Sequence, residues 1–335
     1  MELKSIRAKV DPAAGLAKPA ARHLTVDAES AGQRLDNYLM RELKGVPKTH
    51  VYRVIRSGEV RINKGRVHAD TRVAEGDDVR LPPVRVAERS AYPASQAPPR
   101  EFPILLEDEH LLAIVKPAGV AVHGGSGVSS GVIEQLRRAR QNQPGGLRFL
   151  ELVHRLDKET SGILLLAKKR SALTRLQDQF RSRPHEQKTV GKIYAAAVLG
   201  SWPEKLKVID LALHKGLDAA GERHVRVVSA DHADGRRSIT LVKVLLRRPD
   251  FTLLDVTIKT GRTHQIRVHL AHSGHPIVGD PKYGDFARNR LFAKQHRFER
   301  MFLHARQLAF DHPATGERIT LQAPMPGECE TLLKS

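Results

Sequence analysis

The chain has 335 residues and a formal net charge of +19, from 56 lysines and arginines against 37 aspartates and glutamates. This length is enough for a sizeable core and about two domains. Positive charge spread along most of the chain indicates a polyanionic partner, with nucleic acid first and an acidic membrane surface second. The alternative is a basic soluble protein without such a partner. An aromatic content of 4% argues against a single-strand binder built on rows of stacking rings.

Cysteine usage and the N-terminus bear on the compartment. The chain has one cysteine, Cys329, which cannot form an internal disulfide, so we expect a reducing compartment and a cytoplasmic protein. Apolar runs such as residues 163–167 are far too short to span a bilayer, so no membrane partner is expected. The first residues lack the apolar segment of a secretory signal. We expect residues 1–24 to form a disordered basic arm, with an organelle transit peptide as the alternative.

Residues 25–86 have the pattern of a small domain. Apolar residues recur at helical spacing in GQRLDNYLMREL and in PKTHVYRVIRSG, which predicts two helices. The alternation in EVRINKGRV predicts two short strands around an Asn-Lys-Gly turn, and DDVRLP predicts another strand. Basic residues crowd around the second helix and the turn that follows it: Arg53, Arg56, Arg61, Lys64 and Arg66.

These elements resemble an S4 RNA-binding domain, through GQRLDNYL and GEVRINKGRV. The resemblance implies a small α/β module whose five basic residues contact RNA. The stretch that follows, residues 87–101, is rich in Pro, Ala and Ser and lacks periodicity, so we interpret it as a linker.

Residues 102–330 have the pattern of a second, larger domain. FPILLEDEHLLAIVKPAG predicts two strands around an acidic turn, ELVHRL and GILLLAKK predict two more, and SALTRLQDQF predicts a helix. GKIYAAAVLG, SITLVKVLLRR, FTLLDVTIKT and HQIRVHLAHSG also have strand-like content. Many strands and few helices predict an α+β domain built on a large, mostly antiparallel sheet.

The segment HRLDKETSG, residues 154–162, presents a single carboxylate between two cations. Asp157 lies between Arg155 and Lys158, in the expected loop before the apolar run ILLLA. Nearby positive charge holds a carboxylate ionised, which suits a reactive acid. The residues alone leave an equal alternative, a turn-capping aspartate in a surface ion pair.

Several motifs together resemble one family. HRLDKETSGILLLAKK is similar to the HRLDxxTSGxLLxAK signature of the RluA-type pseudouridine synthases. Three further family motifs, in the same order, resemble KPAGVAVHGG, GKIYAAAVLG and GRTHQIRVHLAHSGHPIVGDPKYG, and MFLHA, HPATGE and APMP resemble the family's C-terminal part. One departure is RSRPHEQKTVG, within residues 181–191, which is longer than the family usually has.

The resemblance implies that uridines of 23S rRNA are isomerised to pseudouridine. The substrate would be the rRNA itself or a large-subunit assembly intermediate, and the enzyme a monomer with no cofactor and no metal. The chain contains no P-loop pattern and no Rossmann-type glycine pattern at a strand end, in agreement with a reaction that needs neither ATP nor a redox cofactor.

The same resemblance assigns roles to particular residues. Asp157 would be the catalytic carboxylate, either as a nucleophile on C1′ or as a base on the C2′ proton. Arg267 would bind that carboxylate in a fork, and Tyr194 would stack on the displaced uracil. Contacts with the RNA are expected from Arg155 and, as weaker candidates for phosphate contacts, from Lys116, Lys158 and Arg262.

Two other patterns point to different chemistry. GVSSG, residues 127–131, satisfies GxSxG, but no strand precedes Ser129, as a hydrolase nucleophile requires. His264, His269 and His272 fall on different faces of an expected strand and turn, with no cysteine beside them, so we expect no metal site.

A rival function belongs to another class, a non-catalytic rRNA-binding assembly factor with a degenerate synthase domain. The net charge and the S4-like segment fit both functions. A degenerate enzyme is expected to have lost at least one residue of the set Asp157, Tyr194 and Arg267, and all three are present. This favours an active enzyme.

Overall fold

The computed structural model describes residues 21–28, 30–43, 46–83, 97–124, 130–141, 149–181, 190–217 and 221–335. These residues belong to two compact units, which divide after Ala94. Residues 1–20 of the expected arm, residues 87–96 of the expected linker, most of the long 181–191 segment and Ser129 lie outside the described residues.

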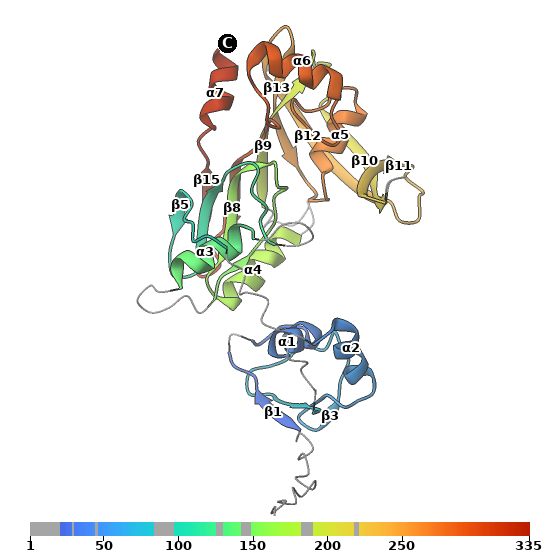
Figure 1. The fold of residues 1–335 in the computed structure, drawn as a ribbon, viewed down its shortest axis with the longest axis vertical. Helices are drawn as coiled ribbons and strands as arrows, with labels where there is room; N and C mark the ends of the chain where they lie inside the picture. Colours follow the sequence, from blue (N-terminus) through green and yellow to red (C-terminus); the bar gives the residue numbers. More distant parts are fainter. Residues whose placement is uncertain are drawn as a thin grey trace, which may run out of the picture. The chain divides into compact units, whose positions relative to one another are not determined.

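The first unit is a four-stranded sheet in the order β1-β4-β2-β3, with two helices packed on it (Figure 1). Its elements are β1 (Arg22–Thr25), α1 (Leu35–Glu42), α2 (Lys48–Arg56), β2 (Arg61–Ile62), β3 (Gly65–Arg66) and β4 (Asp78–Leu81). Asn63 and Lys64 have positive φ angles, 49° and 69°, which is the geometry of a tight hairpin turn. Residues 22–24 belong to this sheet, although we expected them to be part of the disordered arm.

The second unit is built on an eleven-stranded sheet in the order β11-β10-β12-β13-β9-β14-β8-β6-β5, with β15 beside β14 and β7 beside β8. The strands are β5 (Ile104–Glu107), β6 (Leu111–Lys116), β7 (Glu151–Leu152), β8 (Ser161–Ala167), β9 (Gly191–Leu199), β10 (Val208–Leu217), β11 (Arg223–Val228), β12 (Arg236–Arg247), β13 (Phe251–Ile258), β14 (Leu303–Asp311) and β15 (Arg318–Gln322). The pair β14 and β8 is parallel, and the other pairings are antiparallel. The predicted α+β class with a mostly antiparallel sheet is confirmed.

The strand β8 explains the apolar run ILLLA, because all seven of its residues are buried. Leu164 and Leu166 pack with α3 (Val132–Arg140) on one face of the sheet. Ile163 and Leu165 pack with α4 (Arg170–Arg181) on the other. At about 1.5–3 kcal/mol for each buried side chain of this size, the strand is firmly placed, and with it the loop that precedes it.

The segment HQIRVHLAHSG is a helix, α5 (Gln265–His272), and our strand prediction for it was wrong. Its first six residues are all buried, so the helix has no polar face to reveal a period of 3.6 residues. Ile266 and Leu270, one turn apart, pack on the sheet with Val256. Two more helices complete the described part of this unit, α6 (Phe286–His296) and α7 (Gly327–Lys334).

Candidate active site

The loop between β7 and β8 carries Asp157. The Thr160 N–H donates to the Asp157 carbonyl oxygen at 3.1 Å, which closes a turn. The next glycine, Gly162, has a φ of 112°, and a Cβ there would lie 2.3 Å from the carbonyl oxygen of Ala305. The Thr-Ser-Gly sequence therefore lets β8 approach β14 closely and directs the loop. The Asp157 side chain is 21% exposed, so solvent and a substrate can reach it.

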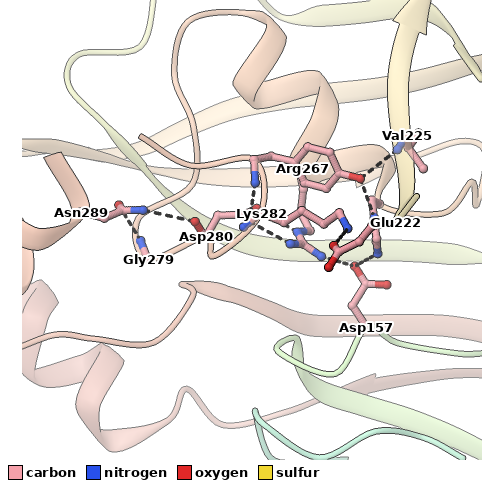
Figure 2. Close-up of polar contacts among 10 residues, drawn as sticks. Asp157, Glu222, Val225, Arg267, Gly279, Asp280, Lys282 and Asn289 are labelled. Carbon is pink, nitrogen blue, oxygen red and sulfur yellow. Dashed lines mark hydrogen bonds and ion pairs between the residues drawn. The ribbon is translucent and has the colours of Figure 1, made fainter. Parts of the chain in front are cut away.

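Arg267 of α5 reaches Asp157 across 110 positions of sequence. Its Nη1 donates to Asp157 Oδ2 at 3.2 Å, and its side chain is 6% exposed. The fork that we expected on Asp157 is made with another carboxylate, because Arg267 Nε and Nη2 donate to the two oxygens of Asp280, each at 2.8 Å (Figure 2). The guanidinium is thus held by a buried partner and offers one remaining edge to Asp157.

Asp280 was missed in the sequence, and it is 1% exposed. Burial alone would raise the pKa of Asp280, but hydrogen bonds from Arg267 and from the backbone N–H groups of Tyr283 and Lys282 lower it. Burial would likewise lower the pKa of Arg267, while its bonds to Asp280 and the charge of Asp157 raise it. Both groups are therefore ionised at neutral pH. The GDPKYG segment holds Asp280, but its spacing gives no sign of this partner.

A histidine, His264, flanks Asp157 on another side, and a tyrosine, Tyr283, contacts that histidine. His264 begins α5 in the left-handed conformation, and its Nε2 lies 3.8 Å from Asp157 Oδ2. Its Nδ1 lies 2.8 Å from the Tyr283 hydroxyl, which accepts from the Val225 N–H at 3.1 Å. Burial lowers the pKa of His264, so the ring is neutral at pH 7. When the Tyr283 hydroxyl donates to Nδ1, the ring proton is on Nε2 and faces Asp157.

Tyr194 lies on β9 and lines the same cleft as Asp157 and Arg267. Burial first, and the charge of Asp157 second, raise the pKa of the Tyr194 hydroxyl above its ordinary value. The phenol is therefore protonated at physiological pH and can donate a hydrogen bond. The three residues that the sequence singled out are thus brought together from a loop, a strand and a helix.

These residues line a cleft of about 710 Å³, a volume typical of ligand-binding sites. Arg155 and Arg262 also line it and are exposed, as their expected contact with RNA requires. The sequence did not identify Phe180 and Lys192, which line it as well; the Lys192 Nζ lies 5.2 Å from the centre of the Phe180 ring. An aromatic side chain beside a cation gives the cleft a surface on which a base could stack.

Lys116 does not have the role that we expected. It is completely buried, and its Nζ donates to the carbonyl oxygens of Pro117, Val120 and Lys158 at 2.8, 2.8 and 3.0 Å. Burial lowers the pKa of Lys116 to about 7. It therefore holds the loop beside Asp157 and cannot contact a phosphate. Lys158 is exposed next to Asp157 but does not line the cleft.

The five cations of the first unit are all exposed on the last turn of α2 and the β2–β3 hairpin: Arg53, Arg56, Arg61, Lys64 and Arg66. Within the described part of the chain, none of them forms an ion pair with a carboxylate. These cations on α2 and the β2–β3 hairpin are therefore available to contact RNA phosphates.

The described residues offer neither a metal site nor a membrane-spanning helix. Among the described residues, no group of three or more histidine, cysteine or acidic side chains is arranged to hold a metal ion. His269 instead bonds through Nδ1 to Thr240 Oγ1 at 2.9 Å. In the described ranges there is also no helix with the length and apolar character needed to cross a bilayer.

Comparison with known proteins identifies the family. The pattern of the RNA pseudouridylate synthase family matches residues 110–272, and that of the S4 domain matches residues 33–79. Ribosomal large subunit pseudouridine synthase C of Yersinia pestis is 47% identical over 317 residues, which cover 92% of this chain and 94% of that protein. The protein of the same name from Escherichia coli (strain K12) is 46% identical over 312 residues, covering 92% and 94%.

The chain belongs to the RNA pseudouridylate synthase family. Among solved structures, Human RNA Pseudouridylate Synthase Domain Containing 4 is 29% identical, with a TM-score of 0.56 over 69% of this chain and 92% of that one. The resemblance found in the motifs is therefore confirmed, both for this synthase and for its S4 domain.

Proposed function

We propose that this synthase converts uridines of large-subunit ribosomal RNA, 23S rRNA, into pseudouridines. The family gives the class of reaction, an isomerisation, and the names of its relatives point to the RNA. One observation supports the proposal most strongly. An ionised arginine, fixed by a buried aspartate, lies 3.2 Å from Asp157 in a cleft with room for a nucleotide.

The isomerisation keeps every atom of the uridine. The N1–C1′ bond breaks, the uracil turns, and C5 forms a new bond to C1′; the proton lost from C5 is balanced by one gained at N1. Asp157 carries out the first step in either of two ways, by attack on C1′ or by removal of the C2′ proton. Both use the ionised carboxylate, and the Arg267 guanidinium donates to one of its oxygens at 3.2 Å.

Tyr194 has two uses in this scheme. Its ring can stack on the displaced uracil, and its protonated hydroxyl can exchange hydrogen bonds with the base or with Asp157. A uridine in folded RNA must first leave its stack, at a cost of a few kcal/mol. Arg155 and Arg262 at the cleft offset that cost through phosphate contacts or by filling the gap.

Residues 25–86 would bind the rRNA through the five exposed cations, and residues 102–330 would catalyse, joined by the linker 87–101. In the same proposal the protein works as a monomer in the cytoplasm, on naked rRNA or on an assembling particle. Molecular mass in solution, alone and with rRNA, tests the oligomeric state.

The reaction is tested by tritium release. The substrate is 23S rRNA labelled at uracil C5 and made in cells that lack this protein, because only unmodified uridines can release the label. We expect release by the wild type and none by Asp157→Asn, with rRNA binding kept. If the wild type binds this rRNA but releases no tritium, the protein is the non-catalytic assembly factor instead.

A further inference from the structure

A second cleft, of about 490 Å³, adjoins the first at the β10–β12 end of the sheet. Arg262 and Thr263 line both clefts, so this segment forms the boundary between them. Lys215 of β10 and Arg236 of β12 line the second cleft but not the first. Neither cleft involves the first unit, and none of these residues has a part in the isomerisation proposed above, apart from Arg262.

Strand register puts the basic side chains of the second cleft on the face that carries the active site. Arg236 pairs with Leu213, and Lys215 pairs with Val225, so each pair shares one face of the antiparallel sheet. Leu213 and Val225 pack against Val268 of α5, the helix that carries Arg267. Lys215 and Arg236 therefore extend the same face outward from the catalytic cleft.

Among the described residues, no carboxylate forms an ion pair with the cations of the second cleft. Lys215, Arg236 and Arg262 are exposed, and within the described ranges none of them forms an ion pair. Their neighbour Arg237, on the opposite face, is paired with Asp210. Asp234 is the one acid among the described residues that line the cleft. Such an excess of positive charge attracts a polyanion.

We propose that the second cleft binds backbone phosphates of the RNA strand that adjoins the uridine held in the catalytic cleft. Arg262 contacts the phosphate at the boundary, and Lys215 and Arg236 contact phosphates further along the strand. This inference rests on the proposed function for the nature of the ligand. It adds that the strand leaves the active site in one direction, over β10 and β12.

The test removes the two cations that are outside the catalytic cleft. The variant Lys215→Ala/Arg236→Ala is compared with Lys205→Ala/Lys243→Ala, which loses the same charge from two exposed lysines that line neither cleft and form no ion pair with another described residue. Lys243 is on β12 but on the face opposite to Arg236. Tritium release is followed in single turnover against enzyme concentration at several salt concentrations, and equilibrium binding of the same 23S rRNA is measured in parallel.

Each phosphate contact with a single strand contributes about 0.7 to the slope of log affinity against log salt. For Lys215→Ala/Arg236→Ala we expect the slope to fall by about 1.4 and the half-saturating enzyme concentration to rise about 25-fold at about 0.1 M salt, with the plateau rate unchanged. The charge-preserving variant Lys215→Arg/Arg236→Lys should restore most of the affinity, which a folding defect would not.

Two outcomes overturn the inference. One is an affinity and salt slope equal to those of the control pair, because the cleft then makes no phosphate contact. The other is a loss of rRNA binding that the charge-preserving variant does not restore, because a structural role then explains it. Failure of the proposed function looks different: the wild type releases no tritium, while the binding comparison between the two pairs still decides whether the cleft holds RNA.

Discussion

At the scale of single residues, the active site depends on an arginine shared by two unlike carboxylates. Asp280 is buried and takes the fork of Arg267, whereas Asp157 is partly exposed and receives one hydrogen bond. This division suits catalysis, because the buried partner fixes the guanidinium while the exposed carboxylate remains free to meet the substrate. When Asp157 reacts, the positive charge of Arg267 therefore still has the carboxylate of Asp280 as its partner.

Replacing Asp280 by asparagine tests this division. The amide nitrogen that Asp280→Asn introduces cannot accept from Arg267, so at least one charge-assisted hydrogen bond is lost, worth about 1.5–3 kcal/mol. We expect the single-turnover rate of tritium release to fall about 10- to 100-fold, with rRNA affinity unchanged. The control is Asp255→Asn, which breaks the Asp255–Arg306 pair outside the cleft. An equal loss of rate in both variants would contradict a specific role for Asp280.

At the scale of elements, the approach of β8 to β14 fixes the start of the catalytic loop. Gly162 makes this approach possible, because it has a positive φ and touches the Ala305 backbone. For Gly162→Ala we expect a loss of at least about 3 kcal/mol in the free energy of unfolding, from backbone strain and from the clash. Urea-induced unfolding measures it.

The matched control for this substitution is Gly316→Ala. Gly316 has a φ of 76°, and a Cβ there would meet no atom within 4 Å. This variant has the strain without the clash, and should lose about 1 kcal/mol. Equal losses for the two glycines would show that the contact with Ala305 does not matter.

The elements also show where the sequence was informative. The helices α1, α2 and α4 were predicted because each has one apolar and one polar face. The helix α5 was mistaken for a strand because it is buried on all sides. The partners of Asp157 could be named through family motifs, but the fork between Arg267 and Asp280 could not, because it depends on how α5 and the following loop pack in three dimensions.

At the scale of the whole molecule, the positive charge of the first unit should affect the binding of rRNA and not the rate of the isomerisation. Arg56 is exposed on α2 and unpaired within the described residues, and Arg22 is exposed on β1, at the other edge of the small sheet from β3. We expect Arg56→Ala to weaken rRNA binding about fivefold at about 0.1 M salt and to leave the plateau rate unchanged. An effect no larger than that of Arg22→Ala would contradict a contact between this surface and RNA.

Two buried histidines, His269 and His304, and the half-buried His154 make the stability of the whole molecule depend on pH. Burial lowers the pKa of His154 to about 3 and those of His269 and His304 to about 4. The unfolded chain, in which histidine has a pKa near 6.5, therefore binds more protons than the folded chain between about pH 6.5 and 4. Stability is fully present above that range and is lost as the pH falls through it.

The slope of this loss reaches about 4 kcal/mol per pH unit when all three histidines contribute. The midpoint of urea-induced unfolding should therefore fall steeply between pH 7 and pH 5. An unchanged midpoint over this range would show that the fold does not hold these three side chains in their neutral form.

The central claim is that Asp157, held by Arg267 in the cleft, isomerises specific uridines of large-subunit rRNA. The most direct measurement is a map of pseudouridines in 23S rRNA from a strain that lacks this protein, supplied with either the wild-type protein or Asp157→Asn. We predict sites that are absent in the strain, return with the wild type and stay absent with the variant. A map that is identical in the presence and absence of the wild-type protein, or sites restored by Asp157→Asn, would contradict the account.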